Sequence, residues 1–268
     1  MTIYVILSGL PGSMTTEAMK VIRQQEDMQL VPYALTGSRD KELSYNGFTL
    51  IPPHGHAAIL RDMKSHYPGL IVVDYSKAPM EQQADLYADQ IGVPFVYGGT
   101  VGDRDLAEKI VRESDISAVI APNMSKQLVA WTAALEYIAR EFPDSFSGYH
   151  GSVHETHQKS KKDPSGTGKA WMGTMRKWGI EFDDMISIRE PDDQRTLGVP
   201  EEYLDGHGYH WFDLKSPDGT VQLSFATKVD GRQTYADGTP DAIRYLHRKV
   251  SEGSRGEVFS MVDVLKGV

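Results

Sequence analysis

The sequence of 268 residues contains no cysteine, and this absence excludes disulfide bonds, thiolate zinc sites and cysteine nucleophiles. Positive charge is also scarce: 28 Lys and Arg stand against 37 Asp and Glu, which gives a net charge of −9. A general nucleic-acid binder needs a large positive field, so we expect no nucleic-acid partner. A local basic pocket for a small anion is still compatible with this balance.

Long hydrophobic runs are missing as well. No stretch approaches the roughly 18 apolar residues that span a bilayer, so we expect no membrane partner. The first apolar run meets turn residues at Gly9 and carries no early Lys or Arg, which is atypical of a signal peptide. We therefore predict a cytoplasmic protein. Its apolar content of 40% and charged content of 24% are typical of a globular chain with one or two domains.

The first half of the chain alternates between short apolar runs and longer amphipathic runs. The apolar runs predict buried strands at Ile3–Leu7, Leu30–Leu35, Phe48–Ile51, Leu70–Asp74, Pro94–Tyr97 and Ala118–Ala121. The amphipathic runs predict helices at Thr16–Gln25, Ala57–Tyr67, Met80–Gln90 and Asp103–Glu113. Such alternation predicts an α/β fold with a doubly wound parallel sheet that is covered on both faces.

The pattern changes after about residue 145. A long helix is predicted over 123–141, and further helices over 167–178 and 239–250. Strands of an antiparallel sheet are predicted near Val153 and at His210–Leu214 and Val221–Ala226, with Asp218-Gly219 as a hairpin turn. We predict a first domain over 1–124, completed by 240–268, and a second, α+β domain with an open mixed sheet over 125–239.

The turn after the first strand runs Ser8-Gly9-Leu10-Pro11-Gly12-Ser13-Met14-Thr15 and opens a helix. Glycines there let the backbone approach a pyrophosphate, and the helix N-terminus favours an anion. Two glycines do not complete the G-x-G-x-x-G pattern, so a tight turn without a ligand stays an alternative. A kinase-like phosphate loop is another, but Met14 and Thr15 occupy the places of its final Gly and its Lys.

The tip of the second predicted strand bears on the choice of nucleotide. An acid at this place binds ribose hydroxyls, whereas an Arg accommodates a 2′-phosphate. The segment Leu35-Thr36-Gly37-Ser38-Arg39 contains no acid, and both Ser38 and Arg39 can donate to phosphate. These residues favour NADPH, with an ordinary solvated loop as the alternative.

The densest chemistry lies between Glu155 and Lys169. Three lysines fall within four positions there, and Ser165-Gly166-Thr167 stands where the next helix begins. Backbone N–H groups and hydroxyls at such a helix start bind carboxylate or phosphate, and Lys161 adds a cation. His157 is the natural proton donor beside them, because histidine titrates near neutral pH. The alternative is a capping Ser165 and a solvated face of lysines.

Other histidines carry weaker signals. His54-Gly55-His56 suggests metal, but no third ligand is evident and Pro52-Pro53 indicate a loop, so we expect no metal. His207 and His210 flank a turn and the start of a strand, where packing or surface roles are usual.

Taken in order, these motifs resemble the dihydrodipicolinate reductase family, and its plant-type branch in particular. The segment from Glu155 to Thr167 resembles the signature loop of that family. The other matching segments are Gly9–Met14, Val72–Ser76, Pro94–Thr100, Ala121–Met124, Gly198–Glu202 and Gly231–Thr239.

The resemblance implies a Rossmann-type dinucleotide-binding domain and a substrate-binding and oligomerisation domain. It implies reduction of a cyclic imine with two carboxylates by NADPH or NADH, in lysine and diaminopimelate synthesis. His157 and Lys161 take the family's proton-transfer roles. The substrate carboxylates are held by Gln158, Lys161, Ser165, Gly166 and Thr167. With Arg39, the cofactor residues are Gly9, Leu10, Pro11, Gly12, Ser13, Met14, Gly98, Gly99, Thr100, Ala121, Pro122, Asn123 and Met124.

The sequence departs from the common bacterial pattern at several places. Gln158 replaces a second histidine, and the Ala between Asp163 and Pro164 is missing. Thr15, Gly99 and Val101 differ in the nucleotide loops, which motivates a second hypothesis of an NADPH-binding regulatory protein without turnover. The family also implies hinge closure around the long helix and a homo-oligomer, either a dimer or a tetramer.

Overall fold

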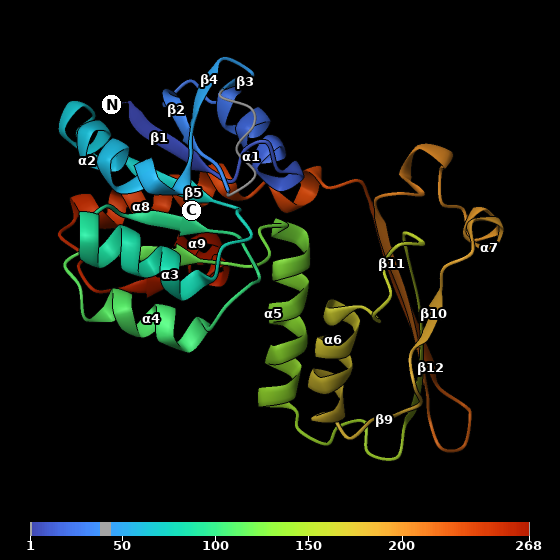
Figure 1. Cartoon of the computed structure of the whole chain (residues 1–268). Helices are drawn as coiled ribbons and strands as arrows, with labels where there is room; N and C mark the ends of the chain where they lie inside the picture. The colour runs from blue at the N-terminus through green and yellow to red at the C-terminus, as the bar shows by residue number, and fades with distance from the viewer. Residues whose placement is uncertain (1, 38–43, 268) are drawn as a thin grey trace. The chain divides into compact units, whose positions relative to one another are not determined.

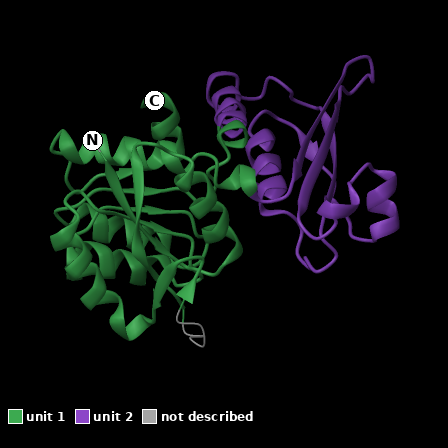
Figure 2. Cartoon of the chain, turned by 90° about the horizontal axis from the view of Figure 1, so that it is seen from above, with its two compact units in different colours: residues 1–129, 233–268 green, residues 130–232 purple. Residues whose placement is uncertain are grey.

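The computed structural model describes residues 2–37 and 44–267. The chain divides into two compact units (Figure 2). The first unit comprises Met1–Val129 and Gln233–Val268, and the second comprises Ala130–Arg232. The chain thus leaves the first unit at residue 129 and returns to it at 233, whereas the sequence pattern had suggested 124 and 240.

The first unit is built on one sheet of eight strands in the order β13-β7-β6-β5-β1-β2-β4-β3 (Figure 1). The strands are β1 (Ile3–Ser8), β2 (Met28–Leu35), β3 (Ser44–Tyr45), β4 (Phe48–Ile51), β5 (Ile71–Asp74), β6 (Phe95–Tyr97), β7 (Ala118–Ile120) and β13 (Val258–Phe259). All neighbours are parallel except β3 and β4. From β1 the chain adds strands first on one side, then on the other, which makes β1 the switch point.

Burial on both faces explains why these strands read as continuous apolar runs. Successive side chains of a strand point to opposite faces. Accordingly, Ile3, Val5 and Leu7 of β1 lie in one hydrophobic cluster, and Ile6 lies in the other. Each cluster is closed by helices, so the predicted doubly wound α/β fold is confirmed.

The helices divide between the two faces of this sheet. Those packed on the first cluster are α1 (Ser13–Arg23), α8 (Thr239–Ser251) and α9 (Met261–Gly267). Those packed on the second are α2 (His56–His66), α3 (Met80–Ala84), the π-helical η2 (Asp85–Ile91) and α4 (Arg104–Arg112). The helix predicted at Met80–Gln90 is therefore α-helical only at its start. Short 3₁₀ turns are η1 (Pro53–Gly55) and η4 (Gln233–Tyr235).

The second unit holds a mixed sheet in the order β10-β8-β11-β12, with β9 beside β8. Its strands are β8 (His150–His157), β9 (Glu181–Phe182), β10 (Ile186–Ile188), β11 (His207–Lys215) and β12 (Gln222–Asp230). β9 and β10 run parallel to β8, whereas β11 runs antiparallel to β8 and β12. The helical segments are α6 (Gly166–Arg176), α7 (Pro191–Thr196), η3 (Glu201–Tyr203) and most of α5 (Lys126–Glu141).

Tryptophans fasten the helices of this unit. The indole N–H of Trp171 on α6 donates to the hydroxyl of Thr132 on α5 at 2.9 Å. Trp178 donates in the same way to the carbonyl of Leu135 at 3.2 Å. Both tryptophans are buried, so each satisfies its polar atom while it fills the core. Within residues 2–37 and 44–267, no helix is both long enough and apolar enough to cross a membrane.

Candidate active site

Four neighbouring parallel strands of the first unit end in register, at Ile120, Tyr97, Asp74 and Ser8. Three of these ends lead directly into the predicted nucleotide loops 9–14, 98–100 and 121–124. The register therefore brings the three loops to the carboxyl edge of one sheet. Dinucleotides bind at this edge, beside the switch point, in doubly wound folds.

Backbone hydrogen bonds extend this register into the loops. Gly98 N–H donates to the carbonyl of Asp74 at 2.8 Å, and Ala121 N–H donates to the carbonyl of Tyr97 at 2.9 Å. These bonds involve no side chain, so they hold the first residue of each loop whatever amino acid follows.

The turn after β1 needs both of its glycines. Gly9 has a φ of +109°, and a Cβ there would lie 2.6 Å from the hydroxyl of Thr15. A Cβ at Gly12 would lie 2.7 Å from the carbonyl oxygen of Gly9. Thr15 is buried, and its hydroxyl donates to the carbonyl of Ser8 at 3.4 Å. Thr15 thus fastens the turn from below and does not offer a group to a ligand.

The start of α1 suits an anion. Its N-cap is Gly12, which has no capping side chain, and the first turn contains no acid. The first N–H groups of a helix have no intrahelical partner, and the helix dipole favours negative charge there. Pro11, Gly12 and Ser13 are exposed around this opening. The turn therefore fits the pyrophosphate of a dinucleotide.

Two predicted cofactor residues direct their side chains into the core. Leu10 is 1% exposed and Met124 is 1% exposed, and both belong to the first hydrophobic cluster. The hydroxyl of Tyr75 donates to the sulfur of Met124 at 3.0 Å and lies 2.6 Å from the hydroxyl of Thr239. A Cβ at Gly98 would overlap the ring of Tyr75. Tyr75 thus ties the second and third loops to the start of α8.

The remaining nucleotide-loop residues are more accessible. Pro122 and Thr100 are exposed, and Gly99 packs against the ring of Tyr97. The side-chain oxygen of Asn123 accepts the N–H of Ser125 at 2.9 Å, which shapes the third loop. Arg39 lies outside the described residues.

A buried carboxylate that the sequence did not single out stands at the end of β5. Asp74 accepts hydrogen bonds from Ser76 N at 2.6 Å, Gln83 Nε2 at 2.5 Å and Tyr87 OH at 2.7 Å. Burial and the neighbouring carboxylate raise the pKa of Tyr87, so its phenol stays a donor. Because Ser76 N also abuts Gly9, this network supports the glycine turn.

In the second unit, His157 is the last residue of β8 and Glu155 precedes it by two positions. The two side chains share a face of the strand, and His157 Nδ1 lies 2.6 Å from Glu155 Oε2. Across the sheet, His157 pairs with Gly208 on β11. A Cβ at Gly208 would come within 3.1 Å of His157 Nε2. The glycine leaves the second ring nitrogen of His157 uncovered on that side.

Glu155 is fully buried and paired on both oxygens. Arg189 donates to Oε1 at 2.5 Å and to Oε2 at 3.0 Å, and the hydroxyl of Ser187 donates to Oε1 at 2.5 Å. Burial alone would raise the pKa of Glu155, but the hydrogen bonds from His157, Arg189 and Ser187 lower it to about 2. The carboxylate is therefore ionised throughout the neutral range.

The loop that follows carries the predicted cation. The backbone carbonyl of Lys161 accepts Arg189 Nε at 2.9 Å, and its N–H donates to the carbonyl of Gln158 at 2.9 Å. The side chains of Lys161 and Gln158 are both half-buried. Among the described residues, no acidic side chain forms an ion pair with the Lys161 ammonium. The backbone of Lys161 is thus held in place by Arg189 and Gln158, four residues after His157.

The start of α6 retains donors for an anion. Ser165 is the N-cap, and its hydroxyl accepts Gly168 N–H at 3.2 Å. The same hydroxyl lies 2.7 Å from His210 Nε2, and burial lowers the pKa of His210 to about 4. Because the capping bond uses Gly168, the N–H groups of Gly166 and Thr167 have no intrahelical acceptor. They stay available to a carboxylate, whereas the Ser165 hydroxyl is already bonded twice.

Sequence reasoning missed Arg189 and His210 as parts of this cluster. Arg189 follows β10, a short and largely exposed strand without a clear pattern, and it reaches Glu155 across 34 positions. His210 was expected to be a packing or surface residue, yet it lies 5.3 Å from the ring of His157. The sequence did carry a signal for Glu155: its two-residue spacing from His157 places both side chains on one face of a strand.

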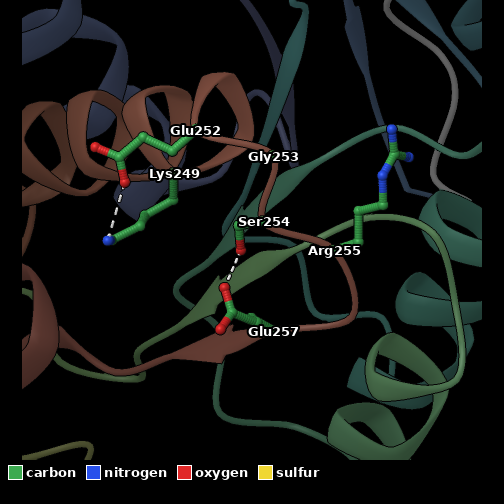
Figure 3. Close-up of a pocket in the computed structure, with 6 residues that line it drawn as sticks. All are labelled: Lys249, Glu252, Gly253, Ser254, Arg255 and Glu257. Carbon is green, nitrogen blue, oxygen red and sulfur yellow. Dashed lines mark hydrogen bonds and ion pairs between the residues drawn. The ribbon is translucent and has the colours of Figure 1, made fainter.

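A surface depression elsewhere in the first unit involves none of the predicted residues. It is lined by Lys249, Glu252, Gly253, Ser254, Arg255 and Glu257, between α8 and β13 (Figure 3). Lys249 pairs with Glu252 at 3.1 Å, and the hydroxyl of Ser254 donates to Glu257. Most of its polar groups therefore bind one another. Within the described residues, no group of three or more acidic and histidine side chains is placed to hold a metal.

Comparisons with known proteins agree with the resemblance to the dihydrodipicolinate reductase family. The model of the family described as "Dihydrodipicolinate reductase, C-terminus" matches residues 128–265. The chain is 38% identical over 272 residues to an Arabidopsis thaliana protein, 4-hydroxy-tetrahydrodipicolinate reductase 1, chloroplastic. That alignment covers 98% of this chain and 78% of the relative. The chain belongs to the dihydrodipicolinate reductase family.

Other relatives agree with this membership in the dihydrodipicolinate reductase family. A rice protein named probable 4-hydroxy-tetrahydrodipicolinate reductase 2, chloroplastic, is 37% identical, over 98% of this chain and 82% of the relative. A solved dihydrodipicolinate reductase from Paenisporosarcina with dipicolinate bound shares the fold, with a TM-score of 0.68 at 15% identity. That likeness covers 98% of this chain and 99% of the other. The resemblance to the plant-type branch is confirmed.

The prediction of a cytoplasmic location is wrong. The rice and Arabidopsis relatives are described as chloroplastic, which contradicts it. Composition could not have made this distinction, because a chain without cysteine has no thiol whose oxidation would depend on the compartment.

Proposed function

We propose that this chain is an NAD(P)H-dependent 4-hydroxy-tetrahydrodipicolinate reductase of lysine and diaminopimelate biosynthesis. It reduces a cyclic imine of the dihydrodipicolinate type to tetrahydrodipicolinate. The observation that carries the proposal is the single loop between β8 and α6. It joins an oriented histidine, a lysine that forms no ion pair within residues 2–37 and 44–267, and a helix start whose first N–H groups have no intrahelical acceptor.

The first unit, residues 1–129 and 233–268, binds the dinucleotide. The turn from Gly9 to Met14 holds the pyrophosphate at the start of α1, and a larger residue at Gly9 or Gly12 would collide with neighbouring atoms of the protein and distort this turn. Residues 98–100 and 121–124 complete the site on the same sheet edge. Leu10 and Met124 contribute through their backbone, because their side chains are buried. Reduced nicotinamide supplies the hydride when it is bound.

The second unit, residues 130–232, binds the substrate. The two carboxylates of the substrate need hydrogen-bond donors and positive charge. Lys161, Gln158 and the N–H groups of Gly166 and Thr167 provide them. Ser165 acts mainly by capping α6 and so by aiming those N–H groups. The ring is thereby held against His157.

His157 supplies the proton that completes the reduction. Hydride adds to a ring carbon of the conjugated imine, and a proton must reach the atom that gains negative charge. Nδ1 is bound to Glu155, so Nε2 is the atom that donates, on the side left open by Gly208. The Lys161 ammonium stabilises the negative charge and assists this transfer.

Neither competing hypothesis gains support. The relatives that match are named as reductases, and nothing among them favours a regulatory protein without turnover. A phosphotransferase would need a lysine at the turn after β1, where Thr15 is buried instead.

Assembly into a dimer or tetramer through the sheet of the second unit is part of the proposal. β12 is the outer strand of that sheet, and its Leu223 is 44% exposed. The neighbouring Val221 is 44% exposed as well. Light scattering after size-exclusion chromatography measures the number of copies, and a monomer at micromolar concentration contradicts this part.

The test of the function is the loss of NADPH or NADH absorbance with freshly generated 4-hydroxy-tetrahydrodipicolinate. We expect consumption that depends on this substrate. His157→Ala should lower turnover by roughly 10²–10⁴-fold, the usual contribution of acid–base help. Cofactor binding without consumption contradicts the proposed activity, and unchanged turnover in His157→Ala removes this residue from the mechanism.

A further inference from the structure

We propose that Glu155 and Arg189 are positioning residues of the reaction: Glu155 orients the imidazole of His157, and Arg189 fixes Glu155 to the loop that carries Lys161. This inference rests on the proposed function and deepens it. Neither residue touches the substrate in this scheme, because each acts through a neighbour.

The first step of the argument is the geometry at Nδ1. The hydrogen bond between Glu155 Oε2 and His157 Nδ1 is 2.6 Å long, and the two side chains lie on the same face of β8. A carboxylate accepts only, so Nδ1 must carry its hydrogen. The proton that leaves or returns during catalysis is then confined to Nε2.

The second step is the role of Arg189. Its guanidinium binds both oxygens of Glu155, at 2.5 Å and 3.0 Å. Its remaining N–H groups donate to the carbonyls of Lys161 at 2.9 Å, Ile188 at 3.0 Å and Asp163 at 3.4 Å. One planar fork therefore connects the partner of His157 to the backbone that carries Lys161. Arg189 thereby sets the distance between the proton donor His157 and the backbone of Lys161.

The third step is that a purely structural ion pair would not need this arrangement. A buried pair is often no more stabilising than apolar residues of the same volume. Here one oxygen of the Glu155 carboxylate is bonded to His157, whose side chain is 15% exposed at the end of β8. The carbonyl of His157 is held as well, by Gln194 Nε2 at 2.7 Å.

The charges around His157 predict opposite effects for the two residues. Glu155 faces it from its own strand, and Arg189 lies behind Glu155 after β10. His210 and His207 approach from β11, and burial lowers the pKa of both, so they are neutral at pH 7. Removing the carboxylate should disfavour the imidazolium of His157, and removing the guanidinium should favour it.

The experiment compares Glu155→Gln, Arg189→Gln and the control Glu190→Gln in the full-length protein. Glu190 is exposed and pairs only with Lys159 among the described residues, at 2.9 Å. We expect Glu155→Gln to lower kcat roughly tenfold to a hundredfold, with little change in the KM for NADPH. Its alkaline limb of kcat against pH should move to lower pH, because a general acid must be protonated.

Arg189→Gln should move the same limb to higher pH and raise the KM for the dicarboxylate substrate. A merely structural pair predicts parallel losses of activity and stability, with no shift of the limb in opposite directions. Glu190→Gln should match the wild type in all three quantities. If Glu155→Gln equals Glu190→Gln in kcat and in the position of the limb, the positioning role is wrong.

A second measurement does not depend on turnover. Titration of His157 by NMR of the Cε1 proton, assigned with His157→Gln, should show a lower midpoint in Glu155→Gln. If Glu155→Gln does not fold, the variant Glu155→Gln/Arg189→Gln leaves no unpaired buried charge and should also show a lowered midpoint. An unchanged midpoint overturns the inference even where the wild type proves inactive. An inactive wild type with a shifted midpoint overturns the proposed function alone.

Discussion

The contact between Gly98 and Tyr75 gives a prediction whose size follows from the structure. A methyl group at residue 98 would overlap the Tyr75 ring, so Gly98→Ala must displace either the loop or the ring. Overpacking of this kind costs about 1–3 kcal/mol. A displaced ring also loses its hydroxyl contact with Thr239, now 2.6 Å, and an unsatisfied buried hydroxyl costs about 1–3 kcal/mol.

We therefore expect Gly98→Ala to lower the free energy of unfolding by about 3 kcal/mol. At 2–4 °C per kcal/mol for a chain of this size, Tm should fall by roughly 6–12 °C. Binding of NADPH, followed by its fluorescence, should weaken at the same time. The reason is that Tyr75 connects the second and third nucleotide loops. Differential scanning calorimetry without ligand measures the first effect separately from the second.

The control is Gly37→Ala, since nothing lies within 4 Å of a Cβ at that residue. Its Tm should stay close to that of the wild type. In a double-mutant cycle, Gly98→Ala should cost less in a Tyr75→Ala background, with a coupling on the order of 1–3 kcal/mol. Equal costs in both backgrounds would refute the argument, because the ring would not be what the methyl group meets.

The other predictions concern charge and access. Arg39→Ala should weaken NADPH binding more than NADH binding, and equal effects in a fluorescence titration contradict a 2′-phosphate role. Gly208→Ala should lower kcat roughly tenfold by crowding His157 Nε2, now 3.1 Å from the added methyl position, and unchanged kinetics exclude Nε2 as the donor. Because the pKa of His210 is about 4 against an ordinary 6.5, the unfolded chain binds more protons between these values. Stability should fall by up to about 3 kcal/mol as the pH drops from 6.5 to 4. Urea unfolding at several pH values should show this loss in the wild type and a flatter profile in His210→Gln.

Most of the first unit could be predicted because its strands are buried on both faces. Ile3–Ser8 was predicted to within one residue, because its apolar run is short and ends at turn residues. Phe48–Ile51 gave a weaker indication, since its second residue is polar and exposed. The π-helical stretch at Asp85–Ile91 could not be predicted, because its amphipathic pattern fits an ordinary helix equally well. It ends at Gly92, whose φ is +69°.

The candidate site was only half predictable. Site residues within one segment, such as His157, Lys161 and Ser165, can be recognised from their spacing in the sequence. Arg189 does not, because it meets Glu155 only after β10 pairs with β8, and β10 is exposed over most of its short length. The packing roles of Leu10 and Met124 were equally hidden, since a loop motif does not reveal which of its side chains turn inward.

Because the strands of the first sheet end in register, the position at which each loop begins does not depend on the residues of the loop. Main-chain bonds such as Gly98 N–H to the carbonyl of Asp74 anchor each loop before its variable part begins. Loop residues beyond these anchored positions can thus be exchanged without moving the strand ends, whereas Thr15 is itself bonded to the carbonyl of Ser8 and supports the turn. A designer could graft the loops of an NADH-selective homologue onto this scaffold and expect the backbone to receive them in place.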